Sequence, residues 1–116
     1  MRRDWLRVHE ALGAIDRVIA LTDGATVDSL SDDATTREAL LWNFTVLGES
    51  LNSVDNSVKD KHPDIPWRRP AALRNRIVHG YWSADLDILL TVAHRDIHTL
   101  QSQLRTVLTS LSPDSV

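Results

Sequence analysis

The chain has 116 residues, of which 42% are hydrophobic and 25% charged, with four Gly, four Pro and no Cys. This length supports one modest core, so we expect a single domain over residues 1–112 and a short tail over 113–116. The lack of Cys excludes disulfides, thiolate metal clusters and a cysteine nucleophile, and the net charge of −3 argues against a protein that coats nucleic acid with its whole surface.

The spacing of apolar residues predicts helices from the first turn onward. From Trp5 to Ile19 the apolar positions follow in steps of three and four, and Asp23-Gly24 supplies a stop, which predicts a helix at about residues 3–22. The stretch 25–33 is polar and irregular. Ser31, Asp32 or Asp33 is a candidate cap for the next helix.

The same rhythm continues from Leu40 to Val58 and predicts a second long helix at about residues 34–60. Two prolines in His62-Pro63-Asp64-Ile65-Pro66 end it. A short helix is expected at about 68–79. After Gly80 and the Ser83-Ala84-Asp85 cluster, one long apolar stripe predicts a last helix at about 84–111.

These elements predict an all-α fold, an antiparallel bundle of three long helices and one short helix. Helices of this length are long for a small domain, so we expect the bundle to dimerise along its side. Apolar residues off the main stripes are candidates for that contact, or they widen the internal face: Leu41, Val46, Leu89 and Val92. No stretch resembles a signal peptide or a membrane span, and we expect a cytoplasmic protein.

Positive charge is concentrated in one segment of the chain. No acidic residue occurs between Asp64 and Asp85, where four arginines fall within nine positions, namely Arg68, Arg69, Arg74 and Arg76. Guanidinium groups suit phosphate, so this patch indicates a local polyanion or nucleotide site. The alternative is a solvated segment whose arginines pair with carboxylates elsewhere.

The patch contains the motif Arg74-Asn75-Arg76-Ile77-Val78-His79-Gly80-Tyr81. An imidazole exchanges a proton near neutral pH, and an arginine neutralises charge that develops on phosphorus. If the substrate is RNA, its own 2′-hydroxyl is the nucleophile, so no metal, cofactor or protein nucleophile is needed. On a straight helix Asn75 and His79 share a face, whereas Arg74 and His79 lie ~140° apart. Arginine's reach, a distorted turn before Gly80, or a second copy of the motif would have to bring them together.

The motif, with Ile65-Pro66-Trp67-Arg68 before it and Asp85-Leu86-Asp87 after it, resembles the HepT-like toxins of the HEPN superfamily. The likeness extends over nearly the whole chain, with similar residues at Thr22-Asp23-Gly24, at Leu47-Gly48-Glu49 and at His62-Pro63.

The resemblance implies a helical bundle that dimerises so that two motifs face one cleft. It implies a metal-independent RNA endonuclease, the toxin of a bacterial toxin–antitoxin pair, encoded with an MNT-type nucleotidyltransferase antitoxin. Carried over residue by residue, Arg74 and His79 are the catalytic pair and Asn75 is their polar neighbour. Tyr81, the only tyrosine of the chain, matches the residue to which the antitoxin transfers AMP.

Further residues around the motif are expected to hold RNA. Arg68, Arg69 and Arg76 would bind the phosphate backbone, and Trp82 would stack on a base. Two other classes of function stay open. In the first, the bundle would be a non-catalytic nucleotide-binding partner of a nucleotidyltransferase. In the second, it would be a purely structural dimeric adaptor.

Other residues with chemical potential are interpreted as structural. His94 and His98 stand four residues apart on the last helix, but with only Asp87 in addition they make an incomplete metal site, and we expect no metal. Gly48 in mid-helix indicates a close approach by another helix. Three tryptophans are expected in the core or at the dimer contact: Trp5, Trp42 and Trp67.

Overall fold

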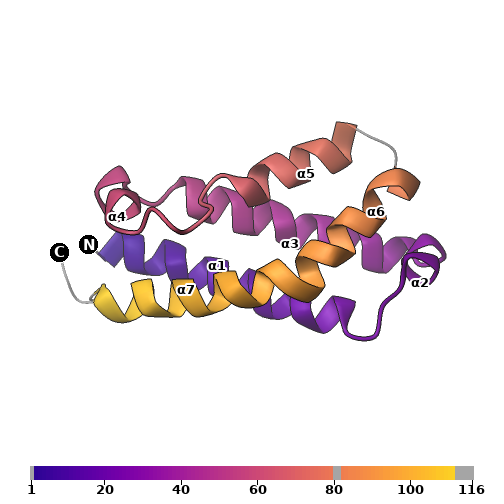
Figure 1. Ribbon diagram of the computed structural model, residues 1–116, viewed down its shortest axis with the longest axis horizontal. Coiled ribbons are helices and arrows are strands. Elements are labelled where there is room, and N and C mark those ends of the chain that lie inside the picture. Colours follow the sequence, from indigo (N-terminus) through magenta and orange to yellow (C-terminus); the bar gives the residue numbers. More distant parts are fainter. Residues whose placement is uncertain (1, 80–81, 112–116) are drawn as a thin grey trace.

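The computed structural model describes residues 2–79 and 82–111, except for the side chains of residues 77–79 and 82–84. Throughout these residues the regular structure is helical, as expected (Figure 1). The elements are α1 (Arg2–Thr22), α2 (Val27–Ser31), α3 (Ala34–Asn52), α4 (Asn56–Lys61), α5 (Arg69–His79), α6 (Trp82–Thr91), the π-helix η1 (Val92–Asp96) and α7 (Ile97–Ser110).

The long helices form an elongated bundle of 46 × 24 × 21 Å. α1 packs on α3 and on α7, and α5 lies along the other side of α3 (Figure 1). Side-chain hydrogen bonds show that α1 is antiparallel to α3 and, through His94–Thr22 and Gln101–Asp16, to the η1–α7 segment. Asp4 at the start of α1 accepts from the backbone of Asp55, whereas Arg17 near its end bonds Asn43. The expected antiparallel bundle is therefore confirmed.

The core runs along the axis of the bundle, because each long helix turns one apolar stripe inward. Its largest fully buried side chains come from α1, α2, α3, α6 and α7: Val8, Ile15, Leu30, Leu40, Phe44, Leu47, Leu51, Leu86, Leu89, Ile97 and Leu104. Leu89 is thus an internal residue and not a dimer contact. Leu41, Val46 and Val92 are partly buried and pack against the same core.

The predicted helix over 34–60 is wrong in one respect, because the chain breaks it into α3 and α4. α3 ends at Asn52, and Asp55 caps α4 by accepting from the backbone N–H of Ser57. The apolar rhythm hides this break, since Val54 and Val58 both face the core on either side of it. The pKa of Asp55 lies below its ordinary value, chiefly because the Ser57 hydroxyl donates to its carboxylate.

Two further boundaries differ from the sequence prediction. The stretch 25–33 contains the short helix α2, which a capping box at Thr26 starts and which buries Leu30. The last predicted helix begins two residues earlier, at Trp82, and carries the π-helical turn η1 in its middle. Of the three residues that the sequence offered as the cap of the next helix, Asp33 caps α3.

The tryptophans do not share one role. Trp67 is buried, and its indole N–H donates to the His62 carbonyl at 3.0 Å. Trp5 is half-buried and stacks on His9. Trp42 is 66% exposed and therefore lies outside the core, so of its two expected places only the dimer contact stays a prediction. No helix in the described part of the chain combines the length and apolar character that a membrane crossing requires.

Candidate active site

α5 carries the motif, and it lies unusually close to α3. A Cβ atom at Gly48 would sit 2.8 Å from the Ala71 Cα, so only glycine fits this contact. The close helix approach predicted at Gly48 is therefore confirmed. Before α5, buried Trp67 fixes the chain to the end of α4, and Pro70 occupies the first turn of α5, where its missing N–H costs nothing.

Arg74 stands one turn beyond this contact and turns toward α3. Its side chain is half-buried, its Nε donates to Thr45 Oγ1 at 3.0 Å, and its Nη1 donates to Asn75 Oδ1 at 3.3 Å. A guanidinium has five N–H groups, so three of them have no protein partner among the described residues. One edge of the Arg74 guanidinium is thus held by protein oxygens, and its remaining N–H groups can donate to an anion.

Arg74 and Asn75 line a shallow hollow between α3 and α5, of about 190 Å³. Sequence reasoning found these two residues but missed those that α3 contributes, including Thr45 and Glu49. Both lie within one turn of Gly48, and that glycine was the available signal, because it marks where α5 approaches α3. The lining residues are Thr45, Glu49, Asn52, Ala71, Arg74 and Asn75.

His79 is the last residue of α5, and its side chain falls outside the described part, as do Gly80 and Tyr81 entirely. The backbone remains α-helical through residue 79, which removes a distorted turn as a means of aligning the motif. In this register, position 79 shares a face with Asn75, whose side chain is exposed, and stands ~140° around the helix from Arg74. The two catalytic candidates therefore start from different sides of α5.

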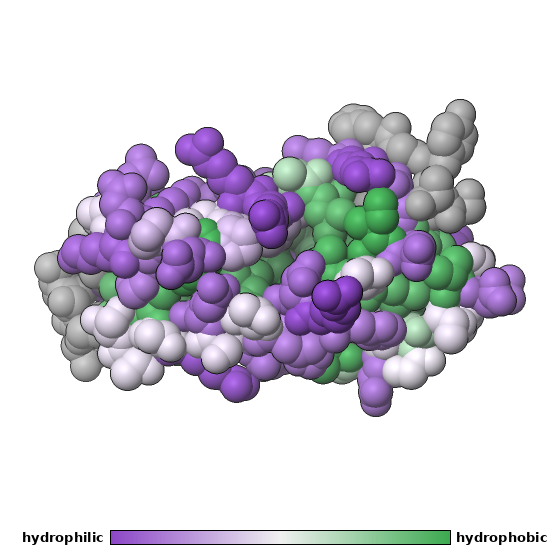
Figure 2. Space-filling model, in the orientation of Figure 1, coloured by the Kyte–Doolittle hydropathy of each residue, from purple (hydrophilic) through white to green (hydrophobic). Residues whose placement is uncertain are grey.

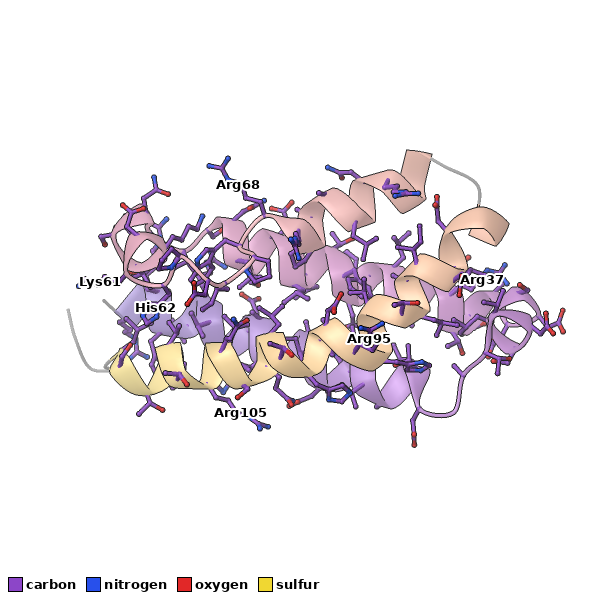
Figure 3. All side chains as sticks on the ribbon, viewed as in Figure 1. Arg37, Lys61, His62, Arg68, Arg95 and Arg105 are labelled. Atoms are coloured by element: carbon purple, nitrogen blue, oxygen red, sulfur yellow. The ribbon has the colours of Figure 1, made fainter. Side chains whose placement is uncertain are left out.

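The other three arginines of the patch do not form one surface with Arg74. Arg76 donates from Nε to Asp85 Oδ1 at 3.2 Å, linking α5 to the first turn of α6. Arg68 is exposed and directed away from the bundle at the start of α5 (Figure 3). Pairing with a carboxylate, the alternative to a phosphate site, is therefore observed for Arg76. The side chain of Trp82 is outside the described part.

Arg69 lies on the rim of a second, apolar hollow of about 200 Å³ between α5 and the η1–α7 rod. Figure 2 shows the hydrophobic surface that surrounds it. Asp96 of η1 also lines this hollow. The lining residues are Phe44, Pro66, Arg69, Pro70, Leu73, Val92, Asp96, Ile97 and Leu100.

The two histidines that the sequence places four residues apart, His94 and His98, have different surroundings. His94 Nε2 lies 2.8 Å from the Thr22 carbonyl at the end of α1, and because a carbonyl only accepts, this nitrogen carries the proton. His98 is exposed on α7. Among the described residues no three histidine or acidic side chains gather closely enough to hold a metal ion.

A model of the family described as "Ribonuclease HepT-like" matches residues 11–107, from the third turn of α1 to the last turn of α7. The chain belongs to the HepT-like ribonuclease family. This match includes α3, α5 and the whole motif, so the recognition of a HepT-like HEPN protein from its residues is confirmed.

Two individual relatives share only 22–28% of their aligned residues with the chain, and their names describe them as ribonucleases. The chain is 28% identical over 101 residues to the "Probable ribonuclease HepT" of Thermococcus cleftensis, covering 87% of this chain and 90% of that protein. It is 22% identical over 100 residues to a protein of Methanocaldococcus jannaschii whose name marks it provisionally as an RNase, covering 86% and 92%. No solved structure matches the chain with significance.

Proposed function

We propose that this HepT-like protein is a metal-independent endoribonuclease in which Arg74 and His79 act on one scissile phosphate of RNA. The observation that carries the proposal is the state of Arg74, which is fixed at Nε and Nη1 at the mouth of an open hollow and has three N–H groups for a ligand. The ribonuclease names of the relatives support RNA as the polyanion.

In the proposed reaction His79 takes the proton of a ribose 2′-hydroxyl, and the 2′-oxygen attacks the adjacent phosphorus. The bond from phosphorus to the 5′-oxygen breaks, and that oxygen leaves with a proton from the imidazolium. The products are a 2′,3′-cyclic phosphate and a 5′-hydroxyl end. Arg74 stabilises the negative charge on the non-bridging oxygens during attack, and Asn75 holds the guanidinium through its Oδ1.

RNA would run along the outer face of α5. Asn75 and position 79 share this face, Arg68 directly precedes the helix, and the side chains of Arg68 and Asn75 are exposed. Arg69 lies toward η1 and would contact phosphates from the side, whereas Arg76 holds Asp85 through Nε and could offer a phosphate only its other N–H groups. Such contacts position a strand without reading its sequence.

The proposal includes the role of a toxin, in which unrestrained cleavage of cellular RNA would arrest growth. Its antidote would be an MNT-type nucleotidyltransferase that adenylylates Tyr81, placing negative charge and bulk beside the phosphate site. Incubation with an MNT-type nucleotidyltransferase encoded beside this chain and with ATP should add AMP units, seen by intact mass, to the wild type and not to Tyr81→Phe. An unmodified wild type would remove this part of the proposal.

The cleavage itself is tested on a pool of end-labelled single-stranded RNA of random sequence, in the presence of EDTA. We expect His79→Ala and Arg74→Ala to lower the rate by about a hundredfold or more, since a general base and an electrostatic donor are each worth this much. His98→Ala, at an exposed histidine away from the motif, is the matched control and should cut like the wild type. A folded His79→Ala protein that cuts at the wild-type rate contradicts the proposal. Binding of nucleotide without any cutting favours the non-catalytic partner.

A further inference from the structure

Among the described residues, Thr45 on α3 makes the one side-chain hydrogen bond that joins this helix to Arg74. Thr45 Oγ1 donates its single proton to the Leu41 carbonyl at 2.9 Å. The same oxygen accepts from Arg74 Nε at 3.0 Å. Because the proton is committed to Leu41, the lone pairs of Oγ1 face the guanidinium, so the hydroxyl acts as a fixed acceptor.

The close helix contact explains how so short a side chain reaches the arginine. α3 and α5 are antiparallel, and they touch where Gly48 meets Ala71. Thr45 precedes Gly48 by three residues and Arg74 follows Ala71 by three, so each is one turn from the contact in the same direction along the bundle. The β-branched Thr side chain has few rotamers in a helix, which keeps Oγ1 in place.

The chemical nature of the acceptor also matters. A carboxylate at this position would neutralise the guanidinium, whereas a hydroxyl holds Nε and leaves the full positive charge for a phosphate. Glu49 lines the same hollow, yet no carboxylate of the described residues forms an ion pair with Arg74. The arginine is therefore oriented by neutral groups, Thr45 and Asn75.

We propose that Thr45 is a positioning residue, which fixes Arg74 through Nε so that its terminal N–H groups point at the scissile phosphate. This inference rests on the proposed function, in which Arg74 stabilises the charge on phosphorus. Thr45 does not touch the substrate. Its effect is to hold the guanidinium in one orientation before RNA binds, so that no ordering is needed during the reaction.

The first test observes the contact without any RNA. In nitrogen–proton NMR spectra of the full chain, the Arg74 Nε–H signal, assigned by its absence in Arg74→Lys, should exchange slowly with water. We expect fast exchange in Thr45→Val, which removes the hydroxyl at nearly constant shape, and slow exchange in Thr45→Ser, which keeps it. Thr109→Val is the control, because Thr109 makes the same bond to the carbonyl four residues earlier, that of Arg105, but is exposed and accepts from no guanidinium.

The second test measures single-turnover cleavage of the random-sequence RNA pool. We expect Thr45→Val to lower the rate at saturating protein by about tenfold or more and to change the half-saturating concentration by less than about twofold, because misplacement of a catalytic group affects the transition state more than binding. Thr45→Ser should restore most of the rate. A structural defect would be shared by Thr45→Ser and would appear in the thermal melt. If Thr45→Val does not fold, Thr45→Ala takes its place.

The outcomes separate this inference from the proposed function. If Arg74→Ala is inactive while Thr45→Val cuts within about twofold of the wild type, the role of Thr45 is overturned and the function stands. Equal loss in Thr45→Ser and Thr45→Val likewise overturns it. If the wild type leaves the RNA pool intact, or Arg74→Ala cuts as well as the wild type, the proposed function fails. The NMR result then still decides whether Thr45 holds Arg74.

Discussion

Arginines that are close together in this sequence differ in what their surroundings let them do. Within the described part of the chain, Arg74 bonds only neutral oxygens and keeps unpartnered N–H groups beside a hollow, whereas Arg76, two residues later, bonds the carboxylate of Asp85. A helix turns by ~100° per residue, so two positions carry the side chain from the α3 side to the α6 side. Sequence clustering identified a basic segment, but the helix distributes its charges over different neighbours.

The ion pair between Arg76 and Asp85 predicts an unequal response to mutation. Asp85 is 9% exposed and Arg76 is 62% exposed at the side chain. Arg76→Ala leaves a buried carboxylate without its partner and should lower the free energy of unfolding by about 1–3 kcal/mol. Asp85→Asn leaves an arginine that water can solvate, so its cost should stay below about 1 kcal/mol. Urea unfolding of both variants measures the difference, and equal costs would contradict this account.

The cap of α3 predicts a specific dependence of stability on pH. The Thr36 hydroxyl and backbone N–H donate to Asp33, which places the pKa of Asp33 below its ordinary value of 3.8. A lowered pKa in the folded state stabilises the fold at pH values above the unfolded pKa, and this contribution is lost as the pH falls through the folded pKa. Asp33→Ala should therefore be less stable than the wild type near neutral pH, and the gap should close in acid.

Urea unfolding of Asp33→Ala and the wild type, from about pH 7 to about pH 3, checks this expectation. Asp33→Asn is the matched control, because an amide still caps a helix but carries no charge. A gap between Asp33→Ala and the wild type that stays constant below the ordinary carboxyl range would show that the carboxylate charge contributes nothing.

Residue-level features divide into those that the sequence predicted and those that depend on a neighbouring helix. Arg74 and Asn75 were expected in the site and lie together at the hollow. Thr45 was not found, because its role depends on a partner 29 residues away that only the packing of α3 on α5 supplies. Trp42 was expected in the core or at a dimer contact, and its helix turns it to solvent, which excludes the core.

The helices themselves were largely predictable from apolar spacing, and the errors have identifiable causes. The rhythm of three and four residues cannot show a break when the residues on either side of it stay buried, as Val54 and Val58 do. Local hydrogen bonds made the break instead, through the Asp55 cap and its contact with Asp4 on α1. The π-helical turn η1 was missed for the opposite reason, since it inserts an extra residue per turn without interrupting the chain of helical bonds.

The contact between α3 and α5 predicts opposite effects for two glycine substitutions. Gly48→Ala places a Cβ within 3.0 Å of Ala71 backbone atoms, so the helices must separate, at a cost of about 1–3 kcal/mol in stability. The separation should also loosen the bond from Arg74 to Thr45 and lower RNA cleavage. Gly13→Ala is the control in α1, where the new Cβ would meet only the flexible Arg17 tip at 3.4 Å, and it should stabilise by up to about 1 kcal/mol. Thermal unfolding compares the two, and a stabilised Gly48→Ala would contradict the close contact.

The whole molecule is a thin bundle whose proposed catalytic groups begin on different sides of one helix. α5 is α-helical from Arg69 to His79, so residues 74 and 79 differ by ~140° in direction and by ~7.5 Å along the axis. A single copy would have to bend a long side chain around the helix to join them. Two copies related by a twofold axis remove the difficulty, because each can present one side of α5 to the other.

This arrangement predicts that two inactive variants restore each other. In this arrangement each of the two sites of a dimer takes its arginine from one chain and its histidine from the other. In a mixed dimer of Arg74→Ala with His79→Ala, one site therefore has both groups intact and the other has neither. An equal mixture that exchanges chains freely should then cut RNA at about a quarter of the wild-type rate, since half of the dimers are mixed and half of their sites are complete. Sedimentation of the mixture shows whether dimers form. The control is a mixture of His79→Ala with the double variant Arg74→Ala/His79→Ala, which has no His79 in either chain and should stay inactive. Mixed dimers that form and remain inactive would place Arg74 and His79 of each site in the same chain, and the reach of the arginine side chain would then have to close the angle between them.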